Sequence, residues 1–429
     1  MRDSKPTSLL FPERRLAAAL LALALAARVV YGVCSPPPGS GGGRLADPDS
    51  YATLADSFSR TWTLSEDGVP SAHREPGYPV LLGLVFLLLG RGYGALLFLN
   101  SLLSTLALWA FWKVSRHVFG SRAALASLAV CAVYPPFLYY AAQSLRESMM
   151  LCLGSLMVWS LAAAQDSGRP ARFLAAGLAG AAAGLTATVF LPFSLCCVPL
   201  LHLYLWRSRL RRGLLLGAVY LAGFLTLYGI WPLRNLRLFD AWILGSTAST
   251  GSTFYEYLVV PQEIGGTKEQ GEYDARLRDP VIAQGGRIQN VVDRERFFFG
   301  KAVERVRSDP WRYVWLVGWR IADYWRLVPR PRAYEHSYGL LKWVSLLTDG
   351  WIIPLAFLGM ALAGARGGPA LWIYAFVFSL NFSYALVLTT IRYRLPVMAW
   401  MILFATAGAG RLWELARRRM PAVRMPTAR

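Results

Sequence analysis

Acidic and basic residues gather in a polar stretch that follows the first apolar segment of the chain. Asp47 and Asp49 stand four and two residues before Tyr51, and further on Arg74 and Glu75 open the run Arg-Glu-Pro-Gly-Tyr-Pro. A carboxylate can accept a proton from a hydroxyl group, and a guanidinium group can bind phosphate. The stretch is far longer than a connection between two helices needs, which is typical of a functional loop. We therefore interpret it as an active-site loop.

The composition is that of a protein embedded in a membrane. Apolar residues make up 55% of the 429, and only 16% are charged. The formal charge is +20, but the arginines lie in short loops between apolar runs, where they orient a chain in the membrane. No soluble basic domain is present to bind nucleic acid, so no such partner is expected. The five cysteines show neither a zinc-site spacing nor a disulfide framework.

The apolar runs predict an all-α integral membrane protein of about ten spans. The expected spans are 16–33, 93–112, 123–141, 148–164, 173–190, 191–206, 213–231, 345–364, 369–390 and 395–411. With the N-terminus in the cytoplasm, this count returns the C-terminus there and places most arginine clusters on the inner side. The first run has basic residues before it and no clear cleavage site, so we expect an uncleaved signal anchor.

Three further segments are expected not to cross the membrane. The apolar piece 79–89 is too short to span and should lie in the interface or re-enter the membrane. Residues 309–328 begin like a helix, with Asp309 as N-cap and a proline in the first turn, but contain several charges, which predicts an interfacial helix. Residues 244–296, rich in Gly, Ser and Thr and including Gly265 and Gly266, are interpreted as a flexible loop over the site.

In this topology, the outer side contains the polar and charged residues that the positive-inside rule does not explain. These are the loop 34–78, Arg146 with Glu147, Arg234 with Asn235, the long segment 232–344, and Arg392, Tyr393 and Arg394. Because positive charge is disfavoured on that side, the arginines require a partner, and a membrane-borne phosphate fits them. Catalysis is therefore expected outside.

In their order along the chain, these motifs resemble the GT-C fold polytopic glycosyltransferases that use polyprenyl-phosphate sugars. The nearest types are the protein O-mannosyltransferases and aminoarabinose lipid A transferases, of the glycosyltransferase family 39 type. The motifs that carry the resemblance are Asp47 to Tyr51, 74–79, Tyr134-Pro135-Pro136 leading to Glu147, Trp231 to Asn235, Asp309-Pro310-Trp311, and 392–396. Two features depart from the family pattern: Arg146 stands where a small hydroxyl residue is common, and Thr186-Ala187-Thr188 lacks an Arg-Pro pair.

The resemblance implies a single transmembrane glycosyltransferase domain over 1–429, a GT-C-like bundle with extracytoplasmic juxtamembrane helices. The outer loop 34–78 would be catalytic, and 232–344 would form a second outer loop. The enzyme would move a hexose or pentose, with inversion, from a polyprenyl-phosphate donor to a lipid, glycan or protein acceptor. The expected place is a bacterial inner (plasma) membrane, among whose lipids the chain would sit.

The predicted roles divide between acids and donor contacts. The resemblance maps the family's first-loop acid onto Asp47, which we predict to be the base. Asp49 is the alternative base. Either Asp47 or Asp49 could instead cap a helix starting near Ser50, and Glu147 is the second acid. The predicted donor phosphate or sugar contacts are Tyr51, Arg74, Glu75, Arg146, Arg234, Asn235, Arg392, Tyr393 and Arg394.

No cofactor is expected, and Glu147 has no clustered acid that would complete a metal cage, although a divalent metal stays an open alternative. The other function considered is a transporter or flippase of a lipid-linked sugar, which could use the same arginines. That class predicts inverted repeats and helices broken at the midplane, whereas the charges here lie at span ends.

Overall fold

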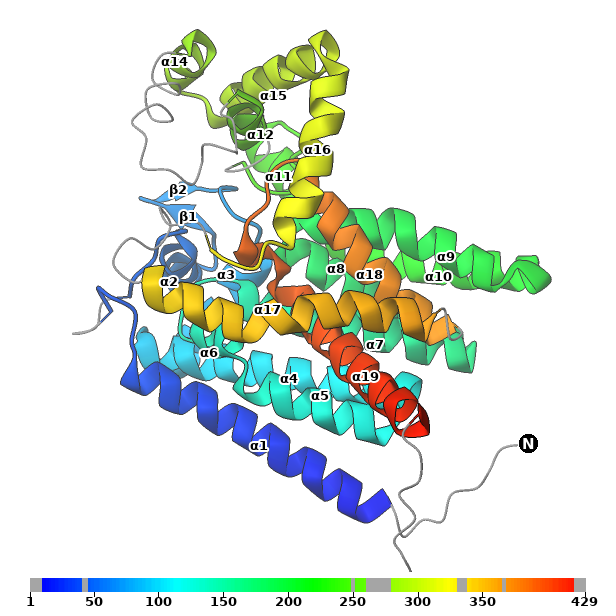
Figure 1. The fold of residues 1–429 in the computed structure, drawn as a ribbon. Helices are drawn as coiled ribbons and strands as arrows, with labels where there is room; N and C mark the ends of the chain where they lie inside the picture. Colours follow the sequence, from blue (N-terminus) through cyan, green and yellow to red (C-terminus); the bar gives the residue numbers. More distant parts are fainter. Residues whose placement is uncertain are drawn as a thin grey trace, which may run out of the picture.

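The computed structural model describes residues 10–40, 45–247, 251–259, 279–329, 338–364 and 368–419. Long helices dominate these residues (Figure 1). The elements are α1 (Leu10–Cys34), α2 (Tyr51–Thr61), β1 (Ser65–Glu66), β2 (Val69–Pro70), α3 (Gly77–Leu89), α4 (Tyr93–Phe119), α5 (Ser121–Val133), α6 (Pro135–Ala141), α7 (Glu147–Ser167), α8 (Pro170–Thr186), η2 (Thr188–Phe190), η3 (Phe193–Cys197), α9 (Val198–Leu205), η4 (Arg207–Arg209), α10 (Leu210–Tyr228), α11 (Ile230–Phe239), α12 (Gly251–Val259), α14 (Pro280–Gly286), α15 (Val291–Ser308), α16 (Pro310–Tyr324), α17 (Tyr338–Ala363), α18 (Gly368–Ala385), η6 (Ile391–Arg394) and α19 (Leu395–Arg419).

The chain is a multi-pass membrane protein. Seven helical stretches among the described residues are long and apolar enough to cross a membrane: Pro12–Cys34, Tyr93–Phe119, Glu147–Ser167, Thr188–Leu205, Arg207–Phe239, Tyr338–Ala363 and Ile391–Arg417. An eighth forms if α5 and α6, bent by 51° at their junction, count as one span. The remaining two predicted spans correspond to α8, with 17 residues, and α18, with 18. The all-α membrane class is confirmed, whereas the count of ten is not.

A buried arginine satisfies the backbone carbonyls that the break between α5 and α6 leaves without helical hydrogen bonds. In an unbroken helix, the N–H groups of residues 135 and 136 would bond the carbonyls of Cys131 and Ala132, but both positions are proline. The guanidinium of Arg28, on α1, donates to these carbonyls instead, at 3.5 and 3.1 Å. It also donates to the Ser104 hydroxyl on α4 at 2.7 Å. One side chain therefore joins three helices inside the apolar core.

The short elements lie together at one end of the long helices, where α2, α3 and the antiparallel β1–β2 hairpin adjoin α11 (Figure 1). The helices α12, α14, α15 and α16 extend beyond them (Figure 1). Their own apolar cluster, formed by Tyr255, Leu258, Phe298, Ala302 and Leu316, holds three of these helices together. The prediction of a flexible loop at 244–296 is wrong for these helical parts, and Gly265 and Gly266 lie outside the described residues.

The two predicted non-spanning helices form as expected. α3 has 13 residues, too few to cross a bilayer. At the start of α16, the Asp309 carboxylate accepts a hydrogen bond from the Arg312 N–H at 3.0 Å, and a proline occupies the first turn. Trp311 and Trp315 remain exposed on this helix, as headgroup-level tryptophans would be.

Candidate active site

Asp47 is held by the first turn of α2. Its carboxylate accepts hydrogen bonds from the backbone N–H groups of Ala52 and Thr53, at 3.0 and 2.8 Å, and from the Thr53 hydroxyl at 2.9 Å. Ser50, in the left-handed region at φ 60°, turns the chain so that this carboxylate faces the helix end. Asp47, and not Asp49, therefore caps the helix. It makes no ion pair with a described residue.

Asp49 lies between two arginines. Its Oδ1 is 3.2 Å from Arg74 Nη2 and its Oδ2 is 2.9 Å from Arg392 Nη2. Arg74 also donates from Nε to the Asp49 carbonyl at 2.9 Å. The first loop and η6, more than 300 residues apart in sequence, thus meet at this carboxylate.

Glu147 is the second acid on Arg392. It is the first residue of α7, is 3% exposed, and binds Arg392 Nε through Oε1. Its other oxygen, Oε2, is buried and has no hydrogen-bond partner among the described residues. A buried unsatisfied acceptor is costly, so a free carboxylate oxygen here indicates a place where a further donor binds.

A second ion pair lies beside the first cluster. Glu75 Oε2 is 2.5 Å from Arg146 Nη1, and Glu75 Oε1 accepts from the N–H and hydroxyl of Thr188, at 3.2 and 3.0 Å. Arg146 also donates to the Thr186 carbonyl at 3.1 Å. Thr188 belongs to the turn 186–188, which lacks the Arg-Pro of the family pattern. Through Thr188, this turn supports the Glu75–Arg146 ion pair. The sequence did not indicate this contact.

Close approach of α3 to the end of α8 makes these contacts possible. A Cβ on Gly77 would lie 2.6 Å from Thr186 Oγ1 and 2.9 Å from the Leu185 carbonyl oxygen. Only glycine allows the two helix ends to approach so closely. Glu75, two residues earlier, is thereby brought to Thr188.

Tyr51 lies between the two ion-pair groups. The guanidinium carbons of Arg74 and Arg146 are 5.5 and 6.0 Å from its ring centroid, within range of cation–π attraction. The side chain is fully buried, yet its hydroxyl has no hydrogen-bond partner among the described residues. With Glu147 Oε2, it is the second orphaned polar atom at the site.

The electrostatics keep these groups charged. Burial alone would raise the pKa of Asp49, but the charge and hydrogen bond of Arg392 and the charges of Arg74 and Arg146 outweigh it and lower that pKa. The pKa of Glu75 is lowered in the same way, against its burial, by Arg146 and the Thr188 hydrogen bonds. Burial raises the pKa of Tyr51, so its hydroxyl stays protonated. Three carboxylates thus face three guanidinium groups.

Three predicted contacts, Arg234, Asn235 and Arg394, bind outside this cluster, whereas Tyr393 lies within range of the charges of Arg392, Arg146 and Glu147. Arg234 donates to Leu64 O and to Asn235 Oδ1, at 3.2 and 2.8 Å, and Asn235 donates to Ile243 O at 3.0 Å. These bonds join α11 to the β1–β2 hairpin region. Arg394 is 4% exposed and binds Asp349, with a further bond to Arg326 O at 2.6 Å. Tyr393 stacks on Tyr384 at 4.4 Å.

The geometry of η6 separates its two arginines. In a 3₁₀ turn, residues three apart share a face, so Ile391 and Arg394 point one way and Arg392 another. Ile391 and Arg394 line an apolar cavity of about 310 Å³ between α6 and α17, with Tyr134 and Leu341 among its other walls. Asp349, which binds Arg394 and accepts from the Tyr134 hydroxyl, was missed because it lies inside an apolar run.

No group of three or more His, Cys, Asp or Glu side chains suited to a metal ion occurs among the residues that the structure describes. At Asp49 and Glu147 the shared cation is the guanidinium of Arg392. The absence of a metal requirement stays a prediction.

The sequence matches the family described as Dolichyl-phosphate-mannose-protein mannosyltransferase over residues 72–234. This region contains Arg74, Glu75, Arg146, Glu147 and Thr188, and the match confirms the predicted resemblance there. No curated protein matches the sequence.

Solved structures share the fold. The oligosaccharyltransferase AglB from Archaeoglobus fulgidus, in complex with an inhibitory peptide and a dolichol-phosphate, aligns over 95% of this chain and 52% of its own, at 13% identity and a TM-score of 0.54. Its apo form aligns over 94% and 51%, at 12% identity and a TM-score of 0.56. The chain therefore spans about half the length of these structures. The predicted GT-C type of membrane fold is confirmed.

Proposed function

We propose that this protein is a membrane glycosyltransferase that transfers a sugar, with inversion, from a polyprenyl phosphate to an acceptor hydroxyl or phosphate. The observation that carries the proposal is the cluster of Arg74, Arg146 and Arg392 with Asp49, Glu75 and Glu147, which holds two orphaned polar atoms. An apolar cavity lies on the other face of η6. The family match over 72–234 supports the reaction class. The dolichol-phosphate named with AglB supports the donor class.

Arg74 and Arg392 would bind the donor phosphate. Both are partly exposed, at 19% and 27%, whereas Glu75 and Glu147 below them are almost fully buried. Guanidinium forks bind phosphate oxygens in pairs, so a donor phosphate competes with Asp49 for the same two arginines. Asp49 then serves to hold them in place before the donor arrives. The apolar cavity beside η6 would take the first isoprene units of the lipid.

Asp47 would be the base. Asp49 is a poor proton acceptor because two arginines lower its pKa. Asp47 is a first-loop carboxylate without an ion pair to a described residue, and the α2 N–H groups fix its direction. Tyr51 and Glu147 Oε2 would contact the sugar hydroxyls, which would satisfy both orphaned atoms.

The reaction balances without a general acid. The acceptor oxygen attacks the anomeric carbon, its proton passes to Asp47, and the bond from that carbon to the phosphate oxygen breaks. The leaving group departs as polyprenyl phosphate, an anion stabilised by the arginines. The acceptor class stays open between lipid, glycan and protein, and a phosphate acceptor would need little help from a base.

The site would face away from the cytoplasm, with both termini inside and the chain in a bacterial inner (plasma) membrane. The basic residues at the ends of α4 and α19 and in η4 support this orientation, since positive residues favour the cytoplasmic side.

The test is transfer from a panel of radiolabelled polyprenyl-phosphate sugars to membrane extracts by the purified protein. Asp47→Asn should lower turnover by about 10² to 10⁴, as loss of a base does, and keep donor binding. Asparagine still caps helices, so the variant should fold. Asp49→Asn removes both the carboxylate that competes with the phosphate and the group that holds Arg74 and Arg392, so it should change donor affinity more than turnover.

Asp56→Asn is the matched control, since Asp56 lies on the same helix in exposed pairs with Arg60 and Arg91. It should behave as wild type. A wild type that binds the donor, transfers nothing and moves it across vesicles would replace the enzyme proposal with a flippase.

A further inference from the structure

A second cavity lies at the other end of the long helices. It measures about 560 Å³, and its walls come from the end of α4, the start of α5 and the ends of α17 and α19. α19 begins next to the candidate site at Leu395, and at about 1.5 Å per residue its Arg411 is roughly 24 Å further along. This cavity is therefore separate from the site described above.

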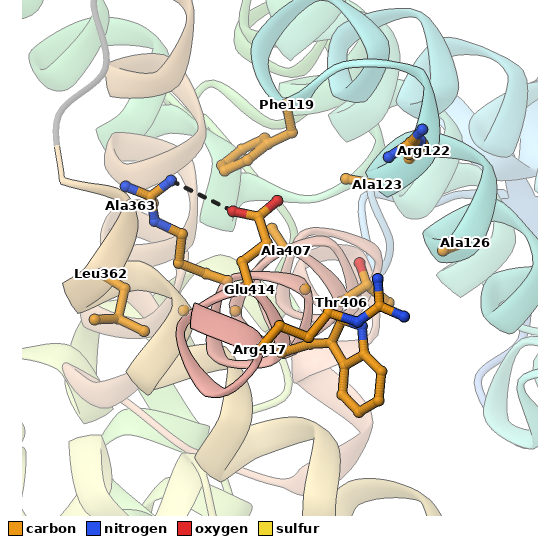
Figure 2. A pocket seen from close by; sticks show the side chains of 15 residues that line it. Phe119, Arg122, Ala123, Ala126, Leu362, Ala363, Thr406, Ala407, Glu414 and Arg417 are labelled. Carbon is orange, nitrogen blue, oxygen red and sulfur yellow. Dashed lines mark ion pairs between the residues drawn. The ribbon is translucent and has the colours of Figure 1, made fainter. Parts of the chain in front are cut away.

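The cavity lies beside a close approach of α17 and α19. A Cβ on Gly408 would lie 2.8 Å from the Gly359 Cα, so the two backbones are in contact there. Two residues on, a Cβ on Gly410 would have nothing within 4 Å. Phe119 and Leu362 line the hollow on its apolar sides (Figure 2).

Its polar walls carry an excess of positive charge. Arg122 from α5 and Arg417 from α19 lie on one side of the hollow (Figure 2). Arg411, which also lines it, pairs with Glu414. The Arg411–Glu414 pair spans 3.8 Å with both side chains more than half exposed, which makes it a weak pair that an anion can open. Arg122 has no ion pair to a described residue, so the lining carries three guanidinium groups and one carboxylate.

The surroundings fit a membrane headgroup. Trp413 is 60% exposed beside the cavity, as tryptophans at the bilayer interface are, and the Arg417 guanidinium carbon is 5.1 Å from its ring centroid. The first turn of α5 has no side-chain cap at Gly120, which leaves backbone N–H groups next to Arg122. Arginine forks match phosphodiester oxygens, and basic pockets between spanning helices bind anionic lipid headgroups.

We propose that this cavity is a binding site for the phosphodiester headgroup of an anionic phospholipid, formed by Arg122, Arg411 and Arg417 and distinct from the candidate active site. The lipid's glycerol and upper acyl carbons would lie against Phe119 and Leu362. The site does not depend on the proposed function.

The test measures lipid binding by native mass spectrometry of the purified chain in neutral detergent, with phosphatidylglycerol and phosphatidylcholine added in turn. Wild type should prefer phosphatidylglycerol by about tenfold or more, which corresponds to about 1.4 kcal/mol. The double variant Arg122→Gln/Arg417→Gln should lose this preference. Gly410→Leu, which fills the hollow without changing charge, should lose it as well.

The matched control is Arg209→Gln/Arg211→Gln, which removes two arginines outside the cavity and should bind like wild type. Equal binding of the two lipids by wild type, or loss of preference in the control, would overturn the proposal. Displacement of the lipid by an equal concentration of inorganic phosphate would identify a soluble-anion site instead. If the double variant does not fold, Gly410→Leu alone decides.

Discussion

Asp47 and Asp49 differ by two positions in sequence and by their whole electrostatic environment in the structure. Asp47 accepts three hydrogen bonds from α2, whereas Asp49 binds Arg74 and Arg392. The sequence could identify both as acids of a functional loop. It could not assign the helix cap, because the left-handed turn at Ser50 decides which carboxylate faces the helix.

Tyr51→Phe tests whether the orphaned hydroxyl is reserved for a substrate. Removing a buried hydroxyl without a partner should leave the melting temperature unchanged or raise it, with a gain of up to about 1 kcal/mol. Sugar transfer should fall if the hydroxyl binds the donor. Thermal unfolding in detergent and the transfer assay are read together, and a variant that is both less stable and fully active would contradict this role.

Glu75→Gln tests the buried pair with Arg146. It should destabilise the protein by about 3 to 5 kcal/mol at neutral pH, because Arg146 keeps its charge without a partner. Since folding lowers the pKa of Glu75 below its ordinary 4.5, its stabilising contribution is present above that pH. It is lost as the pH falls through the folded-state value.

The gap in melting temperature between wild type and Glu75→Gln should therefore be widest near neutral pH and narrow in acid. Glu304→Gln is the control, because its pair with Lys301 is exposed and should matter little at any pH. A difference in melting temperature that stays constant down to about pH 3.5 would show that the charge of Glu75 does not contribute to stability.

At the scale of elements, the site depends on the close contact between α3 and the end of α8, which leaves no room for a larger side chain at Gly77. Gly77→Ala would place a methyl group against the Leu185 carbonyl, which cannot move away as a side chain could. We expect a loss of about 1 to 3 kcal/mol and weaker donor binding, since Glu75 leaves Thr188. Gly94→Ala, with open space around it, should change neither thermal unfolding nor binding.

An element could be predicted from the sequence where a single pattern, such as a long apolar run or an Asp-Pro helix start, stood out in it. Long apolar runs predicted α1, α4, α7, α17 and α19, and the Asp-Pro start predicted α16. The helices α12, α14 and α15 were missed because Gly, Ser and charged residues masked their amphipathic pattern. In η6, both arginines were predicted as donor contacts, but only the 3₁₀ geometry shows that Arg392 faces the acids and Arg394 faces Asp349.

At the scale of the whole molecule, the proposed orientation can be measured with a native cysteine. Cys34 is exposed at the end of α1 that leads into the first loop. A membrane-impermeant thiol reagent should label it in intact cells, because that loop is expected outside. Cys34→Ser should remove the label, while Cys34→Ser/Arg209→Cys should be labelled only after the membrane is opened. Labelling in the reverse order would invert the topology.

The guanidinium of Arg28, which repairs the α5–α6 break, also bears on how the chain is made. α1 is synthesised first, but the carbonyls that Arg28 binds lie 103 and 104 residues later. Before α4 and α5 are synthesised, the guanidinium has among these partners only the Ala24 carbonyl of its own helix, at 2.7 Å. A charged side chain within a span opposes insertion. The Arg28 charge is therefore fully paired within the bundle only once α5 has been synthesised.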